Sequence, residues 1–307
     1  MSQKSVAFTT SMNAPRWKQL LLYSPVARIV IFALVMAALA VLFGSIDHYT
    51  FARGARMSLS TPVGVAMYLT TMPLPAVLAY LFLVRVVERR PAQELSLRRL
   101  PAGVVLGALG GLALFSVVVG VLWLLGSYHV IGTNPHAHWL IALLSVGLGA
   151  GVGEEIVTRG VLFRITEEGL GTWWALAISA LFFGFAHGHN PGATAWSSAA
   201  IAIEAGVLFA LIYHLTRSLW PCMGLHAAWN FAQGTIYGIP VSGTHADGWL
   251  VSTRSGPDWL SGGVFGAEAS VVALLVCSTL SLLLLIAILR RRSIVPPAWR
   301  RRAARPA

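Results

Sequence analysis

The sequence predicts an all-α, polytopic membrane helix bundle with about eight transmembrane helices. Of its 307 residues, 56% are hydrophobic and only 11% are charged, whereas a soluble domain carries about 25% charged residues. Apolar segments of roughly 20 residues, the length that crosses a bilayer, recur along the chain. A chain of this composition cannot hide its apolar surface from water, so the membrane is its expected solvent.

Eight segments have the length and composition of a membrane-spanning helix. They run from about Val26 to Gly44, Val63 to Val87, Ala102 to Ser127, Trp139 to Ile165, Thr172 to His187, Ser197 to Leu215, Leu219 to Tyr237 and Gly266 to Leu289. Pro73 and Pro75 predict a kink in the second helix. Gly107, Gly110 and Gly111 predict that the third helix approaches a neighbour closely.

Basic residues predict the orientation of these helices. With eight helices, the basic-rich connections all fall on one side of the membrane, and only Arg53, Arg56 and Arg254 fall on the other. The positive-inside rule places the basic side, with both termini, in the cytoplasm. The chain then divides into a cytoplasmic N-terminal segment (1–25), helices one to three (26–138), a core of helices four to seven (139–237), an outer loop (238–265), helix eight (266–289) and a basic cytoplasmic tail (290–307).

The net charge of +11 comes almost entirely from arginines at the ends of apolar segments. This placement indicates membrane topology and contact with anionic lipids. No basic patch with interleaved aromatic residues occurs, so we expect no binding to nucleic acids. The preference for Arg over Lys, with many Ala and Gly, favours a bacterial protein and hence the inner membrane. Cys222 and Cys277 lie in apolar segments, where we expect small buried thiols and no disulfide framework.

The fourth helix carries three charges where lipid tolerates few. A charged side chain at the bilayer centre costs on the order of 3 kcal/mol, so Glu154, Glu155 and Arg159 indicate a functional site facing the bundle interior. Glu155 and Arg159 have the spacing and order of an i,i+4 ion pair. Glu154 is rotated by about 100° from Glu155 and can point elsewhere. The alternative is one neutralising network that only holds helices together.

Two further helices contribute polar residues at helical spacing. His187 follows Phe183 by four residues, and His226 precedes Asn230 by four, so each pair shares one helix face. Alone, each pair is explained by interhelical hydrogen bonds. Together with an acid they form a possible set of catalytic groups. A carboxylate can activate water, and a histidine can assist it or bind a metal. A His/Asn pair can donate hydrogen bonds to an oxyanion.

These motifs resemble the CPBP family of intramembrane proteases, which includes prenyl-protein CAAX endopeptidases and bacteriocin-processing or immunity proteins. The family pattern EExxxR, FxxxH and HxxxN/D occurs here in order, as Glu154–Arg159, Phe183–His187 and His226–Asn230. The resemblance covers about residues 139–237. It implies peptide-bond hydrolysis within the membrane, on a membrane-associated protein or peptide substrate.

Carried over residue by residue, the resemblance implies a role for each candidate. Glu154 would activate the attacking water with help from His187, and His226 and Asn230 would stabilise the oxyanion. The supporting residues, which hold the geometry, would be Glu155, Arg159 and Phe183.

A divalent metal remains an open alternative at the sequence level. Glu154, His187 and His226 could supply three ligands to a zinc ion with water in a fourth position. The HExxH spacing that would require a metal does not occur. We therefore favour a site without tightly bound zinc, and a metal analysis of active, chelator-washed protein distinguishes the two.

The remaining polar residues have structural interpretations. Glu204 in the sixth helix is expected to pair with His214 or Tyr213. His129, His136 and His138 in the third connection could bind a metal, but a solvated loop is the favoured interpretation. Asp247, Asp258 and Glu268 are expected to be ordinary outer-loop or helix-end residues.

Two non-proteolytic functions compete with the protease. A membrane scaffold or bacteriocin-immunity protein could retain the polar site as structure only. A proton-coupled transporter is less favoured, because the polar residues cluster in three helices and no repeat relates the two halves of the chain. The oligomeric state is not determined by the sequence.

Overall fold

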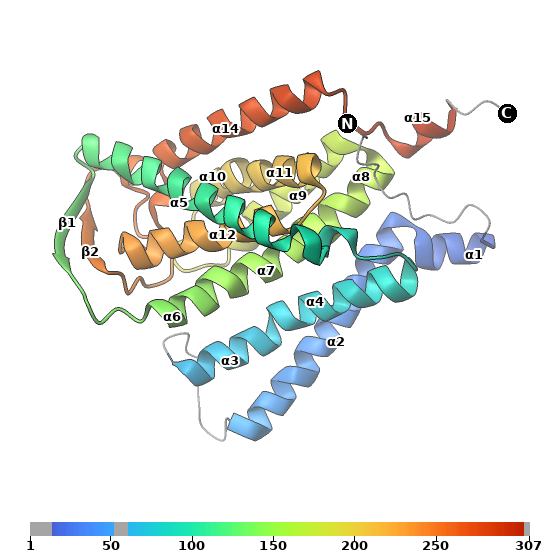
Figure 1. The fold of residues 1–307 in the computed structure, drawn as a ribbon, viewed down its shortest axis with the longest axis horizontal. Helices are drawn as coiled ribbons and strands as arrows, with labels where there is room; N and C mark the ends of the chain where they lie inside the picture. The colour runs from blue at the N-terminus through green and yellow to red at the C-terminus, as the bar shows by residue number, and fades with distance from the viewer. Residues whose placement is uncertain (1–13, 52–60, 304–307) are drawn as a thin grey trace.

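The protein was analysed as a computed structural model that describes residues 14–51 and 61–303. Long helices lie side by side, with a small sheet at one end (Figure 1). The α-helices are α1 (Arg16–Lys18), α2 (Pro25–Phe51), α3 (Pro62–Thr71), α4 (Pro73–Phe82), α5 (Leu100–Leu124), α6 (Trp139–Ala142), α7 (Ala150–Glu155), α8 (Arg164–Leu170), α9 (Thr172–His187), α10 (Ala195–Ile201), α11 (Leu208–Thr216), α12 (Trp220–Phe231), α13 (Asp258–Ser261), α14 (Val271–Arg290) and α15 (Ala298–Ala303). Segments with wider π or tighter 3-10 turns are η1 (Gln19–Tyr23), η2 (Leu83–Val87), η3 (Gln93–Leu95), η4 (Leu97–Arg99), η5 (Leu143–Gly149), η6 (Ile156–Phe163), η7 (Ala202–Val207), η8 (Ala232–Ile236) and η9 (Ala267–Ala269).

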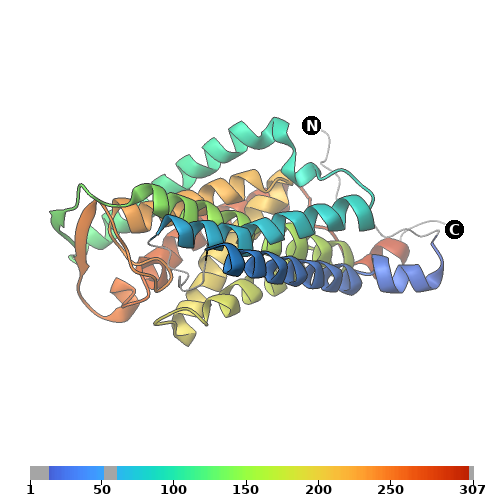
Figure 2. The same ribbon diagram turned by 90° about the horizontal axis from the view of Figure 1, so that it is seen from below.

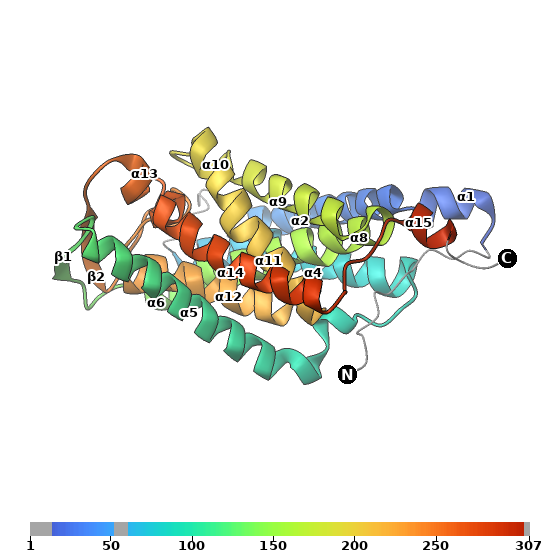
Figure 3. The ribbon, with the colours of Figure 1, turned by 90° about the horizontal axis from the view of Figure 1, so that it is seen from above.

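Several of these helices are long and apolar enough to cross a membrane, which confirms the predicted polytopic helical bundle. In the described residues there are six, Pro25–Thr50, Pro62–Val87, Gln93–Leu124, Trp139–Leu170, Ala195–Thr216 and Val271–Arg290. Two further expected spans are shorter: α9 has 16 residues, and α12 with η8 has 12 and 5. Helix α9 lies beside α10, and α12 lies beside α5 (Figure 3). A count of eight therefore stays a prediction.

A two-stranded sheet is the one departure from the expected all-helical fold in the described residues. Strands β1 (Tyr128–Thr133) and β2 (Leu250–Arg254) pair antiparallel, so the third connection and the outer loop are joined (Figure 1). The backbone N–H of His138 donates to the Asp247 carboxyl. This bond is the main reason that the pKa of Asp247 lies below its usual value. The outer loop is thus tied to the helix end that precedes the site.

The second helix is broken where its prolines predict a kink. Helix α3 ends at Thr71 and α4 begins at Pro73, because a proline removes a backbone donor and clashes with the preceding turn. The break places the Met72 side chain against α7, where a Cβ on Gly153 would lie only 2.3 Å from its sulfur. The kink therefore packs directly beside Glu154.

Glycines bring α5 into backbone contact with α12, as the sequence predicts. A Cβ on Gly107 would lie 2.3 Å from the carbonyl oxygen of Pro221, and one on Gly111 would lie 2.4 Å from that of Leu225. Figure 2 shows the two helices running alongside each other. Small residues at such contacts are the usual means of close helix packing in membranes.

Gly107→Ala and Gly111→Ala are each expected to lower the free energy of unfolding by about 1–3 kcal/mol, because the added methyl group must displace backbone atoms of α12. Gly120→Ala is the matched control on the same helix, since a Cβ there would meet no atom within 4 Å. Denaturant titration in detergent measures all three variants. Equal effects at Gly107 and Gly120 would contradict the packing argument.

A buried ion network holds the first long helix to the core. Arg28 on α2 is fully buried and donates to Glu88 at 3.0 Å and to Glu168 at 2.6 Å. Arg164 also donates to Glu88, at 2.9 Å. These residues lie at the end of the bundle that carries α1, α8 and α15, opposite the sheet (Figure 1). The sequence patterns did not predict this network, because its partners are 60 to 140 residues apart.

Several basic connections meet at this end, where the backbone N–H of Leu219 donates to the carbonyl oxygen of Glu94 and that of Thr172 to the carbonyl oxygen of Val295. The side of the membrane on which this end lies stays a prediction. The predictions that rest on Lys4, Arg53, Arg56 and Arg305 lie outside the described residues.

The fourth helix is longer than the sequence analysis predicts, and the difference matters for the site. It ends at Leu170, five residues beyond Ile165, and Gly171 with φ +85° starts a turn into α9. Glu154 is thus 16 residues from this turn and His187 is 15 residues beyond Thr172. At 1.5 Å per residue both side chains lie at a similar depth, roughly 22–24 Å from the turn. A helix ending at Ile165 would place Glu154 only 11 residues from its end and leave the two side chains mismatched by roughly 6 Å.

Candidate active site

Three helices bring one carboxylate and two imidazoles together. Glu154, near the end of α7, has its Oε2 atom 3.8 Å from Nε2 of His187 on α9 and 3.9 Å from Nε2 of His226 on α12. This oxygen is buried and makes no hydrogen bond to another described residue. Both separations exceed hydrogen-bond length, so neither histidine bonds this oxygen directly.

The tautomer of His187 is set by its own helix. Its Nδ1 lies 2.8 Å from the backbone carbonyl oxygen of Phe183, which can only accept a hydrogen bond. Nδ1 therefore carries the proton, and Nε2 of the neutral ring is a free acceptor directed toward Glu154. The FxxxH spacing explains this bond, because residues four apart lie one turn apart on the same face.

Glu155 points away from Glu154 and makes the expected ion pair. Its Oε1 accepts from Nη1 of Arg159 at 3.0 Å and from Nδ1 of His226 at 3.0 Å, and both Glu155 and Arg159 are fully buried. One carboxylate therefore neutralises the arginine and orients the second histidine. The bond fixes Nε2 of His226 as the ring atom that faces Glu154.

Both terminal nitrogens of the Arg159 guanidinium have hydrogen-bond partners, whereas its Nε has none in the described residues. Its Nη2 donates to the carbonyl oxygens of Ala205 and Gly206 in η7, at 3.0 and 3.1 Å. Its central carbon lies over the rings of Phe183 and Phe209, 4.6 and 5.1 Å from their centroids. Cation–π contacts are strongest when desolvated, as here. Arg159 thus joins its own helix to α9 and to the η7–α11 helix at the height of the site.

Asn230 lies on the same face of α12 as His226. Its Nδ2 donates to the carbonyl oxygen of Val146 in η5 at 2.8 Å, which fixes the amide. An amide nitrogen has two N–H donors, so a second donor remains for another acceptor. The structure therefore brings together all seven residues that the sequence singles out, in one layer of the bundle.

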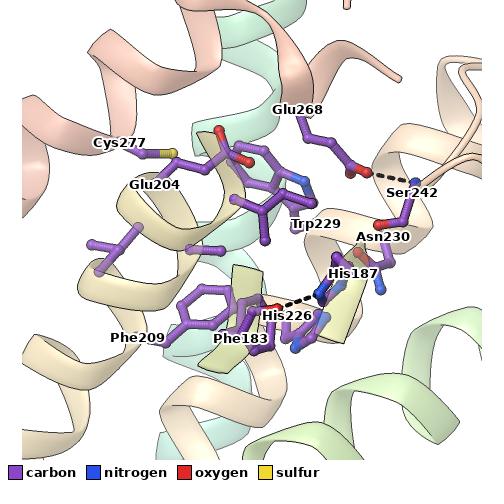
Figure 4. Close-up of a pocket in the computed structure, with 13 residues that line it drawn as sticks. Phe183, His187, Glu204, Phe209, His226, Trp229, Asn230, Ser242, Glu268 and Cys277 are labelled. Atoms are coloured by element: carbon purple, nitrogen blue, oxygen red, sulfur yellow. Dashed lines mark hydrogen bonds between the residues drawn. The ribbon is translucent and has the colours of Figure 1, made fainter. Parts of the chain in front are cut away.

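A cavity of about 30 Å³ lies beside the two histidines (Figure 4). One water needs roughly 10–15 Å³ of such volume, so the cavity holds about two water molecules. The residues that line it are Phe183, His187, Ile201, Glu204, Ala205, Leu208, Phe209, His226, Trp229, Asn230, Ser242, Glu268 and Cys277. Glu154 does not line this space.

Two of these lining residues correct the sequence analysis. Glu204 does not pair with His214, whose Nδ1 instead lies 2.6 Å from Glu167, nor with Tyr213 in the described structure. Glu268 is no ordinary loop residue, because it is 97% buried beside the site. For Glu204, the sequence does offer a signal of a functional role, because it is a single acid in an apolar helix. For Glu268 no sequence signal existed, since its position depends on how η9 folds back.

As they are arranged, the donors do not have the spacing of a bound zinc ion. In the described part of the chain, no group of three or more His, Cys, Asp or Glu side chains is placed to hold a metal ion. Zinc ligands at 2.0–2.1 Å in tetrahedral geometry lie roughly 3.3 Å apart, whereas Glu154 lies 3.8 and 3.9 Å from the two histidines. No chemical step is therefore derived through a metal.

Comparison with known proteins identifies part of the chain. Residues 136–232 match the family model described as "Type II CAAX prenyl endopeptidase Rce1-like". The matched segment contains every candidate catalytic and supporting residue, and it confirms the resemblance to the CPBP intramembrane proteases. No curated protein and no solved structure matches the chain. The Rce1-like domain supports a CAAX-type intramembrane endopeptidase, which is a hydrolase.

Proposed function

We propose, from the premise of this Rce1-like domain, that the chain hydrolyses a peptide bond of a membrane-associated protein or peptide with a glutamate-activated water. The observation that carries the proposal is the convergence of Glu154 with Nε2 of His187 and of His226, from three helices, within 4 Å. Neither histidine ring is free to turn, because Phe183 and Glu155 hold the opposite nitrogens.

Glu154 is the proposed general base. A water between Glu154 and His187 gives a proton to the carboxylate while its oxygen attacks the carbonyl carbon of the substrate. The unprotonated Nε2 of His187 accepts a hydrogen bond from the second O–H of this water, which stays on the attacking oxygen, and so orients its lone pair. Collapse of the tetrahedral intermediate breaks the C–N bond, and the proton held by Glu154 passes to the leaving amine.

His226 and Asn230 are the proposed oxyanion donors. The second N–H of the Asn230 amide is available beside the site. Nε2 of His226 can donate only when the ring carries both protons, and the Glu155 carboxylate accepts the one on Nδ1. Donors fixed before the reaction stabilise a developing oxyanion without reorganising, which is the largest single contribution in many hydrolases.

The direct test is cleavage by the purified protein in detergent, with peptides that carry a membrane-spanning or membrane-proximal segment. Specific hydrolysis at one bond, detected by mass spectrometry, supports the proposal. Proton-coupled uptake into liposomes without any cleavage would favour a transporter. The proposed location is a bacterial inner membrane with both termini in the cytoplasm, which the basic residues at one end of the bundle support.

Asn230→Ala is expected to lower kcat by about 10²–10³-fold, because removing one oxyanion donor from a preformed site has this effect. KM should change little, since the bond forms only in the transition state. Asn230→Asp is the matched comparison, which keeps the size but replaces the donor. A loss confined to KM in Asn230→Ala would contradict the assignment and indicate a substrate-binding role.

A further inference from the structure

We infer that the cavity beside the histidines is a subsite for a primary ammonium group of the substrate, bound by Glu204 and Glu268; the inference rests on the proposed peptidase function. Figure 4 shows the carboxylates of these two residues on one side of the cavity, with His187 and His226 on the other. They come from η7 and η9, outside the three motif-bearing helices.

Glu204 is a buried carboxyl without a partner. The residue is 98% buried, and its Oε2 atom makes no hydrogen bond within the described residues. Its neighbours in the cavity are apolar or weakly polar, including Cys277 and Phe209. An acid buried in a membrane helix is costly unless it pairs, and such residues mark functional sites by default. An unpaired acid aimed at a cavity therefore points to a ligand.

Glu268 is held in place by the protein but is not neutralised by it. Its Oε1 accepts the backbone N–H of Ser242 at 2.5 Å. Neither this acid nor Glu204 forms a salt bridge in the described part of the chain. Gln233 and His187 also act on the Glu268 carboxyl, while Arg254 donates to the carbonyl oxygen of Ser261. Gly266, at φ +137°, makes this placement feasible, since a Cβ there would lie 2.3 Å from the carbonyl oxygen of Pro240.

The size and donor set of the cavity select the cation. A volume of about 30 Å³ holds about two waters, which is room for an ammonium head and not for a hydrated ion or a guanidinium. The described residues offer no set of three ligands for a metal. Rings of Phe183, Phe209 and Trp229 form apolar walls along which the methylene stem of a lysine can lie.

The position beside the catalytic residues gives the subsite a role. His187, His226 and Asn230 belong both to the cavity wall and to the proposed catalytic group. An ammonium bound there therefore lies next to the scissile bond, and it comes from a lysine side chain or from a free N-terminus close to that bond. Both sources offer the same chemistry, three N–H donors and one positive charge.

The first test measures kcat/KM of the wild-type protein on matched peptides. Lysine at each position flanking the cleaved bond is replaced in turn by norleucine and by Nε-acetyl-lysine, and the N-terminus is either free or acetylated. One lysine position should be preferred over norleucine by about 10–100-fold, the range for a charge-assisted hydrogen bond. Dependence on the free N-terminus instead would assign the ammonium to that source. Equal cleavage of all peptides would overturn the inference.

Variants assign the preference to the acids. In Glu204→Gln and Glu268→Gln the ratio of lysine to norleucine cleavage should fall toward one, while Asp258→Asn, on an exposed acid of the same outer loop, should keep the wild-type ratio. A wild-type ratio in both glutamine variants would overturn the inference.

A second measurement separates this inference from the proposed function. Butylammonium chloride should raise the Tm of the wild-type protein above that in sodium chloride of equal concentration, and Glu204→Gln should lose the shift. Glu154→Gln should keep it, because Glu154 does not line the cavity. A Tm shift without any peptide cleavage would contradict the proposed function but support the ammonium subsite. Peptide cleavage without any Tm shift would support the proposed function and contradict the subsite.

Discussion

Glu154→Gln is expected to lower kcat for peptide hydrolysis by about 10²–10⁴-fold while the protein stays folded. The amide has the same shape as the carboxyl but cannot accept a proton from water, and general-base catalysis contributes this much to a rate. Glu154 makes no ion pair with Arg159, and its side chain is 26% exposed, so its charge is not needed to hold helices together. Single-turnover cleavage with purified protein measures the effect, and the Tm measures folding.

Asp258→Asn is the control, because it removes an exposed acid far along the chain from the motifs. It should keep the wild-type rate and Tm. Full activity in Glu154→Gln would sink the proposed mechanism. If no peptide is cleaved by either protein and Glu154→Gln keeps a cellular phenotype, the non-catalytic scaffold or immunity function would be favoured.

Glu155→Ala, unlike Glu154→Gln, is expected to unfold more easily, with a free energy of unfolding lower by about 3–5 kcal/mol. Removing one partner of a buried ion pair leaves the other charge uncompensated in a low-dielectric environment. Here the stranded group is Arg159, which is fully buried, and Nδ1 of His226 loses its acceptor as well. Denaturant or thermal unfolding in detergent measures the change.

The double variant Glu155→Leu with Arg159→Met tests the cause. Replacing both partners of a buried pair by apolar residues of similar volume is often neutral for stability, so the double variant should be more stable than Glu155→Ala alone. Its activity should remain low, because His226 is no longer oriented. A double variant as unstable as the single one would show that the carboxylate acts through a contact other than Arg159.

The division of roles between Glu154 and Glu155 could be predicted from the sequence because it is local. Adjacent helical residues point about 100° apart, and residues four apart meet on one face. These rules alone placed Glu155 with Arg159 and left Glu154 free to face other helices. The structure agrees: Glu155 bonds Arg159 at 3.0 Å, and Glu154 lies 3.8 Å from His187. The same rule predicted that Phe183 and His187 share one helix face, and there Nδ1 of His187 bonds the Phe183 carbonyl oxygen.

What the sequence by itself determined is the membrane class, the apolar helices and the residues that three of them offer, since composition and helical period are properties of short segments. Only the tertiary structure decided which groups meet. The turn at Gly171 brings Glu154 and His187 to one depth, and the fold of η9 turns Glu268 toward Glu204. These contacts depend on where helices end and how they pack, and no spacing along the chain encodes them.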